Sequence, residues 1–207
     1  MTKTQQKEAY HHGDLPRALV SAACEAIQKG GIENLSLREV ARTAGVSVAA
    51  PYRHFDSKQD LLAAVGIEGF RRFTLVLEDA VESTPGDAFA KLTAIGHRYI
   101  QFAVENPSFI EVMFGPSFAC GEEYPALHEA GEQAYAHLLK VVAACHEQIG
   151  STANVEVTAI MAWSMVHGLS SLLSSNKMQR RSDEEIEQLI NAVLATFESG
   201  LRALGSA

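Results

Sequence analysis

Apolar residues recur at three- and four-residue steps through most of the chain, beginning near residue 15. In the first such run the apolar positions are Leu15, Ala18, Leu19, Ala22, Ala23, Ala26 and Ile27. This spacing places them on one face of an amphipathic α-helix. Asp14 can cap its N-terminus, Pro16 is tolerated in its opening turn, and the Gly30-Gly31 pair predicts its end.

The rest of the chain predicts further helices and no alternating strand. A long helix is expected from Lys58 to about Val81, followed by helices at about 87–105, 107–114, 122–148, 154–175 and 183–204. The breaks between them fall at proline and glycine positions such as Asn106-Pro107, Gly115-Pro116 and Gly150. We therefore expect an all-α fold.

Residues 36–58 predict two short helices joined by a tight turn. Ser36 can cap the first helix, and Glu39 can reach back to the Ser36 amide to form a capping box. Gly45 permits a left-handed turn, after which Ser47 can cap a second helix that runs through Phe55. In a helix-turn-helix unit of this kind, the second helix enters the major groove of DNA.

Several short motifs lie within this unit and beyond it. They are the tract Tyr52-Arg53-His54-Phe55, the pairs Ser57-Lys58 and Leu61-Leu62, the opening Tyr10-His11-His12-Gly13-Asp14-Leu15, and Trp163-Ser-Met-Val-His167-Gly168. From about His11 to Phe73 the chain resembles the DNA-binding domain of the TetR family of transcriptional repressors. The opening tract and the Trp-x-x-x-His-Gly sequence are similar to one subgroup. The resemblance implies a flexible arm (1–12), a helix-turn-helix domain (13–73) and a C-terminal ligand-binding and dimerisation domain (74–207).

Helical spacing assigns an orientation to the side chains of the second helix. If Val48, Pro51 and Phe55 face inward, the side chains toward DNA are Ser47, Ala49, Ala50, Arg53 and His54. Arg53 is the expected base reader, because a guanidinium can bond O6 and N7 of guanine together. The resemblance implies further phosphate and groove contacts from Ser36, Arg38, Tyr52, His54 and Lys58. Pro51 departs from the aliphatic residue usual in the family, which leaves open whether Val48 faces protein or DNA.

The formal charge of −8 is unusual for a DNA-binding protein, but the charge is unevenly distributed. Residues 1–58 hold eight Lys and Arg against six Asp and Glu, whereas residues 59–207 hold nine against nineteen. The first part is therefore +2 and the rest −10 when histidines are neutral. A mildly basic head can bind phosphate while an acidic body discourages nonspecific adhesion.

The composition of the chain predicts a cytoplasmic protein. Lys, Gln and His fill the first dozen residues, where a signal peptide would have an apolar run. The apolar stretch Ala159–Leu173 is shorter than the roughly twenty residues that span a bilayer. Cys24, Cys120 and Cys145 are odd in number and widely spaced, which favours reduced thiols.

The last two predicted helices carry apolar and small residues that can pair with a second copy of the chain. Four such helices form a bundle around a two-fold axis, so we expect a homodimer. The two recognition helices would then lie about 34–36 Å apart, which matches a near-palindromic operator.

Large apolar side chains gather near the proline and glycine breaks of the C-terminal part: Phe102, Phe109, Met113, Phe114, Phe118 and Trp163. Such a cluster forms either an ordinary core or the lining of a pocket, and the resemblance implies the pocket. Its occupant would be an apolar or aromatic effector, oriented by polar groups such as His128, Tyr135 and His167. Such an effector regulates DNA binding only if it prefers one conformation of the dimer.

Two other classes of function have weaker support in the sequence. His128-Glu129 and His146-Glu147 begin like a zinc-protease motif, but the second histidine position holds Glu132 or Gly150. Gly115–Ala119 lacks the last glycine and the preceding strand of a nucleophile elbow. We therefore expect no enzyme, no metal and no nucleotide cofactor. The other alternative is a DNA-bound scaffold for a protein partner, which a filled core with an exposed apolar patch would favour.

Overall fold

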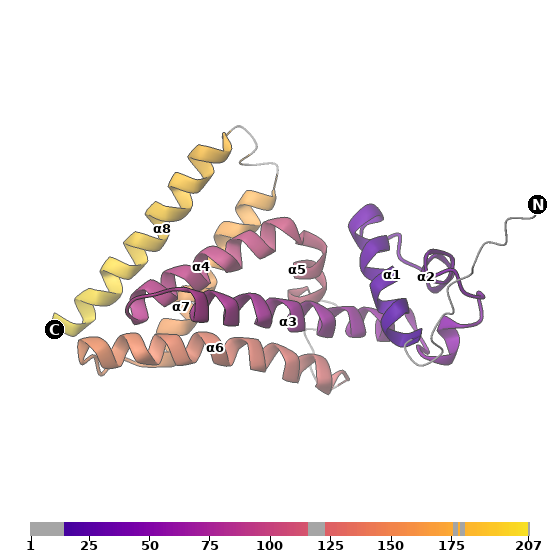
Figure 1. The fold of residues 1–207 in the computed structure, drawn as a ribbon, viewed down its shortest axis with the longest axis horizontal. Coiled ribbons are helices and arrows are strands. Elements are labelled where there is room, and N and C mark those ends of the chain that lie inside the picture. The colour runs from indigo at the N-terminus through magenta and orange to yellow at the C-terminus, as the bar shows by residue number, and fades with distance from the viewer. Residues whose placement is uncertain (1–14, 116–122, 176–177, 179–180, 207) are drawn as a thin grey trace, which may run out of the picture. The chain divides into compact units, whose positions relative to one another are not determined.

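The structure is a computed structural model that describes residues 15–115, 123–175, 178 and 181–206. The α-helices of these residues are α1 (Leu15–Gly30), α2 (Leu37–Thr43), α3 (Lys58–Ser83), α4 (Ala88–Glu105), α5 (Pro107–Phe114), α6 (Pro125–Ile149), α7 (Val155–Ser174) and α8 (Asp183–Ala203) (Figure 1). Two 3-10 helices, Pro51–Arg53 and Leu204–Ser206, complete the described residues, which contain no strand. The predicted all-α fold is confirmed, and most helix ends lie within a few residues of the predicted positions.

The chain divides into two compact units, residues 1–65 and 66–207. The division falls inside α3, which continues from one unit into the other, and lies N-terminal to the expected boundary at residue 73. The expected flexible arm over residues 1–12 lies outside the described part of the chain, as does Asp14.

In the first unit, α1 packs against α2 through its predicted apolar face. Leu19, Ala23 and Ile27 of α1 are buried, as are Val40 and Ala41 of α2. Glycines end both helices in the left-handed region, Gly31 at φ 75° and Gly45 at φ 68°. The turn after α2 is therefore of the kind that the sequence predicts.

In the second unit, α4 is the central helix and packs against α5, α6, α7 and α8. Its inner face includes the buried side chains of Phe89, Ile95, Tyr99 and Ile100. At Gly96 the absence of a side chain lets α8 approach closely, because an added Cβ would lie 2.6 Å from the Leu194 Cδ2 atom. The second unit is thus a layered helical bundle assembled around α4.

Helix α7 is long and apolar enough to cross a membrane by length and composition, with a mean hydropathy of 1.3. It packs against α4 and α6, and core helices of helical bundles meet the same criterion. Thr158, Ala162 and Val166 on its inner face are buried. One face of α7 is therefore packed in the second unit.

The cysteines do not form disulfides within the described residues. Cys24 and Cys145 are buried free thiols, and Cys120 lies outside the described residues. Burial raises the pKa of Cys145 to about 12, so this thiol stays protonated and unreactive at neutral pH.

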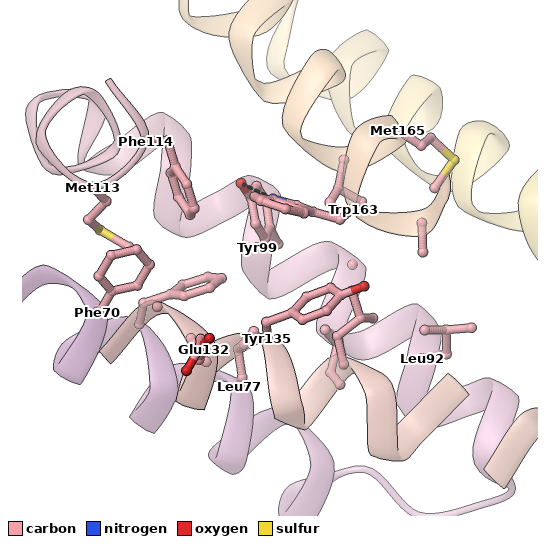
Figure 2. Close-up of a pocket in the computed structure, with 18 of the residues that line it drawn as sticks. Phe70, Leu77, Leu92, Tyr99, Met113, Phe114, Glu132, Tyr135, Trp163 and Met165 are labelled. Carbon is pink, nitrogen blue, oxygen red and sulfur yellow. Dashed lines mark hydrogen bonds between the residues drawn. The ribbon is translucent and has the colours of Figure 1, made fainter. Parts of the chain in front are cut away.

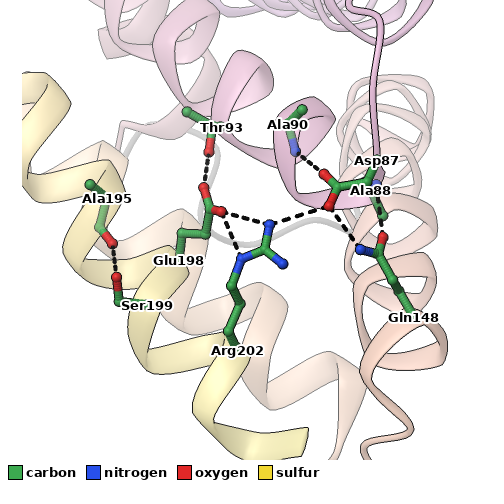
Figure 3. Close-up of polar contacts among 9 residues, drawn as sticks. All are labelled: Asp87, Ala88, Ala90, Thr93, Gln148, Ala195, Glu198, Ser199 and Arg202. Atoms are coloured by element: carbon green, nitrogen blue, oxygen red, sulfur yellow. Dashed lines mark hydrogen bonds and ion pairs between the residues drawn. The ribbon is translucent and has the colours of Figure 1, made fainter.

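A polar network joins the N-terminus of α4 to the ends of α6 and α8 (Figure 3). Asp87 caps α4 by accepting from the Ala90 amide at 2.9 Å and also accepts from Gln148 Nε2 at 2.8 Å. Arg202 donates to both Asp87 and Glu198, and its guanidinium lies 3.7 Å from the centre of the Phe89 ring. The network therefore holds the C-terminal end of α8 against α4.

The charge of Asp87 predicts a pH-dependent contribution to stability. The hydrogen bond from Gln148, then those from the Ala90 amide and Arg202, lower the pKa of Asp87 from 3.8 to about 2. This contribution is complete above pH 3.8 and is lost as the pH falls through 2. Asp87→Asn, which keeps a capping oxygen, should lower Tm at neutral pH, and calorimetry should show the difference shrinking in this acid range. An unchanged difference at pH 2 would contradict the account.

Candidate DNA-binding surface and ligand cavity

Residues 47–55 do not form the regular α-helix predicted from the sequence. Two successive tight turns, with Ala50 N–H bonded to Ser47 O at 2.9 Å and Arg53 N–H to Ala50 O at 3.2 Å, lead into the 3-10 helix Pro51–Arg53. Pro51 stands at the first position of this helix and has no amide to donate to a preceding turn. The prediction of a helix from Ser47 to Phe55 is therefore wrong in type and extent.

The structure fixes which side chains of this segment face outward. Pro51 is fully buried and Phe55 is 8% exposed, so both face inward as expected. Val48 is 49% exposed, so the inward orientation considered for it is wrong. The backbone departs from helical spacing before Pro51, and this turns Val48 toward the surface.

Most of the candidate DNA contacts lie on the surface. Exposed side chains are those of Ser36, Arg38, Ser47, Val48, Ala49, Tyr52, Arg53 and His54, whereas Ala50 and Lys58 are half-buried. The side chains of Arg38 and Arg53 have no ion pair or hydrogen bond with any described residue. Two exposed guanidinium groups are therefore available to an anion.

Arg42 differs from these two arginines because its guanidinium is paired on the same helix. Its Nε donates to Glu39 Oε2 at 3.1 Å, and this hydrogen bond lowers the pKa of Glu39. Ser36 Oγ accepts from the Glu39 amide at 3.2 Å, so the predicted cap is present. The Glu39 carboxylate, however, bonds Arg42 in place of the Ser36 amide predicted by the capping box.

Lys58 has a structural contact that the sequence analysis did not anticipate. Its ammonium donates to the carbonyl of Ile32 at 2.8 Å and to that of Glu33 at 3.4 Å, which ties the start of α3 to the α1–α2 connection. Beside it, Ser57 caps α3, with Ser57 Oγ accepting from the Asp60 amide at 3.1 Å. Lys58 therefore braces the first unit, whatever contact it makes with phosphate.

The second unit contains a cavity of about 340 Å³ (Figure 2). Side chains of α3 to α8 line it, and most of them are apolar or aromatic. The predicted residues among them are Met113, Phe114, His128, Tyr135 and Trp163. The volume lies near the lower end of the range of about 300–1,000 Å³ typical of small-molecule sites.

The other predicted pocket residues lie elsewhere. Phe102 is buried against Phe73, with ring centroids 5.2 Å apart. The guanidinium of Arg72 lies over the Phe109 ring, 5.3 Å from the ring centroid. Neither lines the cavity. Phe118 is outside the described residues. Sequence clustering could not separate these core side chains from the lining, because that distinction depends on how α4 and α5 are rotated.

Trp163 and His167 of the Trp-x-x-x-His-Gly sequence meet on one residue of α4. The Trp163 indole N–H donates to the Tyr99 hydroxyl at 3.3 Å, and the same hydroxyl is hydrogen-bonded to Nδ1 of His167 at 2.8 Å. His167 itself does not line the cavity, whereas Tyr99 and Trp163 do. Burial raises the pKa of Tyr99 to about 12. Sequence reasoning missed Tyr99, whose only signal was its place on the apolar face of a predicted helix.

A second tyrosine of the cavity has no such partner. The hydroxyl oxygen of Tyr135 is buried and has no hydrogen bond among the described residues. Burial is the main cause of a raised pKa of Tyr135, and the negative charge of Glu156 raises it further. The Tyr135 ring packs near Trp163, with centroids 5.8 Å apart, so a buried and unsatisfied polar atom lies beside the aromatic wall of the cavity.

Two family models match separate parts of the chain. Residues 19–65 match the model of bacterial regulatory proteins of the tetR family, and residues 92–197 match that of the Tetracyclin repressor-like C-terminal domain. The second match alone covers half of the chain. The chain belongs to the TetR family. It is accordingly a DNA-binding transcription regulator and not an enzyme.

Known relatives of this TetR-family chain agree with the assignment. The uncharacterized HTH-type transcriptional regulator YobS of Bacillus subtilis is 24% identical over 189 residues, which cover 89% of this chain and 91% of YobS. The HTH-type transcriptional regulator BetI of Rhizobium meliloti is 36% identical over 91 residues, which cover 43% of this chain and 45% of BetI.

Solved structures of similar fold extend the comparison to nearly the whole chain. A protein of unknown function from Rhodococcus sp. RHA1 has 31% identity and a TM-score of 0.83, with 95% of this chain and 100% of that chain covered. The transcriptional regulator FadR of Bacillus subtilis, solved in complex with stearoyl-CoA, has 19% identity and a TM-score of 0.72, with 89% and 98% covered. The similarity to FadR is a similarity of fold alone.

The two tyrosines of the cavity predict different effects on stability when their hydroxyl groups are removed. Tyr99→Phe should destabilise the second unit by about 1–3 kcal/mol, because the part-buried nitrogens of Trp163 and His167 lose their hydrogen-bond partner. Tyr135→Phe, the matched control, removes only an unpaired hydroxyl and should be neutral or stabilising. Urea unfolding followed by fluorescence of Trp163, the single tryptophan of the chain, measures both. Equal losses of stability in the two variants would contradict the hydrogen-bonding role assigned to the Tyr99 hydroxyl.

Proposed function

We propose that this TetR-family chain is a homodimeric repressor that binds a near-palindromic operator and is released by a small apolar or aromatic molecule. The observation that carries the DNA-binding assignment is the outward set of side chains around the buried anchors Pro51 and Phe55, with Arg38 and Arg53 unpaired. Because the chain belongs to the TetR family, operator DNA is the expected ligand of this surface.

Arg53 is the proposed base reader of the segment. It is exposed and is the last residue of the 3-10 helix, which begins at the buried Pro51. Its neighbours Tyr52 and His54 are exposed and can donate to phosphates, as can Arg38 and Ser36 from the start of α2. Val48, Ala49 and Ala50 then supply apolar contacts to the groove, and Ser47 a hydroxyl.

The outer face of α7 supports dimerisation through the last two helices. Exposed apolar residues recur along it at helical spacing: Val157, Ile160, Met161 and Leu172. Ser164, Gly168 and Ser171 lie on the same exposed face, and a Cβ added at Gly168 would meet no atom within 4 Å. An exposed mid-helix glycine costs about 1 kcal/mol relative to alanine. A second copy of α7 that approaches closely at Gly168 would offset this cost.

The cavity supports release by a small molecule over the scaffold alternative. It lies among the helices of the second unit, and a structural neighbour, FadR, was solved in complex with stearoyl-CoA. Release from the operator then depends on an occupant that prefers one conformation of the protein.

A path from the cavity to α3 is available through α5. Met113 and Phe114 of α5 line the cavity. Met113 also lies against Gly69 of α3, where an added Cβ would be 2.8 Å from its sulfur atom. An occupant that displaces α5 would therefore press on α3, whose first residue, Lys58, braces the connection that precedes α2.

Selection of bound duplexes from a random pool tests the DNA contacts. Arg53→Ala should relax the preference at one base position by about 1–3 kcal/mol. Arg38→Ala should weaken binding to all sequences alike and reduce its dependence on salt. Arg42→Ala, an equal change of charge at a guanidinium paired within α2, is the control and should have little effect. Uniform loss from Arg53→Ala would contradict its base-reading role.

The oligomeric state tests the α7 face. Gly168→Leu places a side chain at the proposed crossing point and should weaken the dimer by about 1–3 kcal/mol, since overpacking of a close contact costs this much. Ala143→Leu adds the same side chain at an exposed position of α6 and should leave the dimer intact. Sedimentation equilibrium distinguishes the two. An unaltered dimer in Gly168→Leu would place the interface elsewhere.

A further inference from the structure

The charged side chains that line the cavity are mainly acidic. Its lining includes Glu132 of α6 and Glu198 of α8, together with the imidazole of His128, and contains no Lys or Arg among the described residues. The undescribed residues 116–122, between α5 and α6, have no Lys or Arg in their sequence either. An anionic head group held here would meet no permanent positive charge, and burial of an unpaired charge is unfavourable.

The two carboxylates differ in how far they are already neutralised. Glu198 is bonded to Arg202 and accepts from the Thr93 hydroxyl at 3.0 Å. Glu132 is 3.1 Å from Nε2 of His128, which carries a positive charge only when protonated, and its side chain is 68% exposed. Glu132 is therefore the carboxylate that remains available at the solvent-facing part of the cavity.

The cavity lining that contains Glu132 also includes several aromatic rings. Phe70 packs against Gly131, the residue before Glu132, since an added Cβ there would lie 3.2 Å from the Phe70 ring. Figure 2 shows Glu132 between Phe70 and Tyr135 in the lower part of the cavity, with Tyr99 and Trp163 above. The faces of aromatic rings attract cations, and a neighbouring carboxylate adds to that attraction.

Two further observations point the same way. Residues 59–207 carry a formal charge of −10, and a cleft in an acidic body concentrates cations and repels anions. The unpaired Tyr135 hydroxyl marks the cavity as a place where an occupant can supply a missing hydrogen bond. Its oxygen points away from Glu132 in Figure 2, so it would meet a polar atom in the body of the ligand and not the charged head.

We infer that the cavity selects an amphiphile with a cationic head over an anionic one with the same chain, and that Glu132 and the adjacent aromatic rings recognise the head. This inference rests on the proposed effector function and names the chemical class of the effector. It distinguishes this chain from the neighbour solved with stearoyl-CoA, whose ligand is anionic.

Trp163 supplies the signal for the test, because it lines the cavity and is the only tryptophan. The full-length protein is titrated with decyltrimethylammonium, decanoate and decanol, at concentrations that leave its helical circular dichroism unchanged. At low ionic strength the ammonium should quench Trp163 with an affinity about tenfold above that of decanoate and above that of decanol, and added salt should reduce the difference.

Matched variants assign the preference to its residue. Glu132→Gln should lower the ammonium affinity about threefold, the size expected of an exposed charge pair, and leave decanol unchanged. Glu129→Gln removes the same charge from an exposed position of α6 that does not line the cavity, and should change neither.

Four results would overturn the inference, and they fall into two groups. Decanoate or decanol binding as tightly as the ammonium would reject cation selection, and equal effects of the two variants would reject recognition by Glu132; each would leave a ligand cavity in place. Failure of all three compounds to quench Trp163 would also remove the proposed effector site. The operator selection is independent of these titrations and would still test DNA binding.

Discussion

The hydroxyl group of Tyr99 fixes the rotation of α7 against α4, and much of the second unit depends on that rotation. Trp163 and His167 lie one helical turn apart and both bond this hydroxyl, so their face of α7 must point toward α4. The opposite face, which carries Met161, Ser164 and Gly168, is thereby left exposed. One polar contact thus determines which side of α7 lines the cavity and which side can meet a second copy.

A different constraint organises the proposed DNA-binding surface. Pro51 cannot donate a backbone hydrogen bond, so the segment that would otherwise form a continuous recognition helix folds as two turns and a single 3-10 helix. The burial of Pro51 and Phe55 anchors this short segment. Because the anchors point inward, Val48, Tyr52 and Arg53 point outward, and the proposed surface for DNA forms without a regular helix.

The sequence was informative wherever a local rule decides the structure. Gly31 and Gly45 end helices because both adopt positive φ, and Ser36 and Ser57 begin helices because their hydroxyls accept from amides three residues on. Apolar spacing, together with breaks at proline and glycine, placed α4, α7 and α8. The family motifs then identified the function of the chain, since residues 19–65 and 92–197 match the corresponding models.

The sequence was less informative where contacts between distant residues decide. Tyr99 is 64 residues from Trp163, and no local pattern pairs them. The contact of Lys58 with the carbonyl of Ile32 spans 26 residues. Phe102 and Phe114 look equivalent in the sequence, but only Phe114 lines the cavity. Such distinctions depend on helix rotation and packing, which periodicity does not determine.

The most direct test of the central claim is a crystal structure of the dimer on a duplex obtained by selection. Our account predicts that the segment from Ser47 to His54 lies in the major groove, with the Arg53 guanidinium within hydrogen-bonding distance of a base edge and Arg42 still paired with Glu39. A complex in which this segment faces solvent, and another surface contacts the duplex, would contradict it.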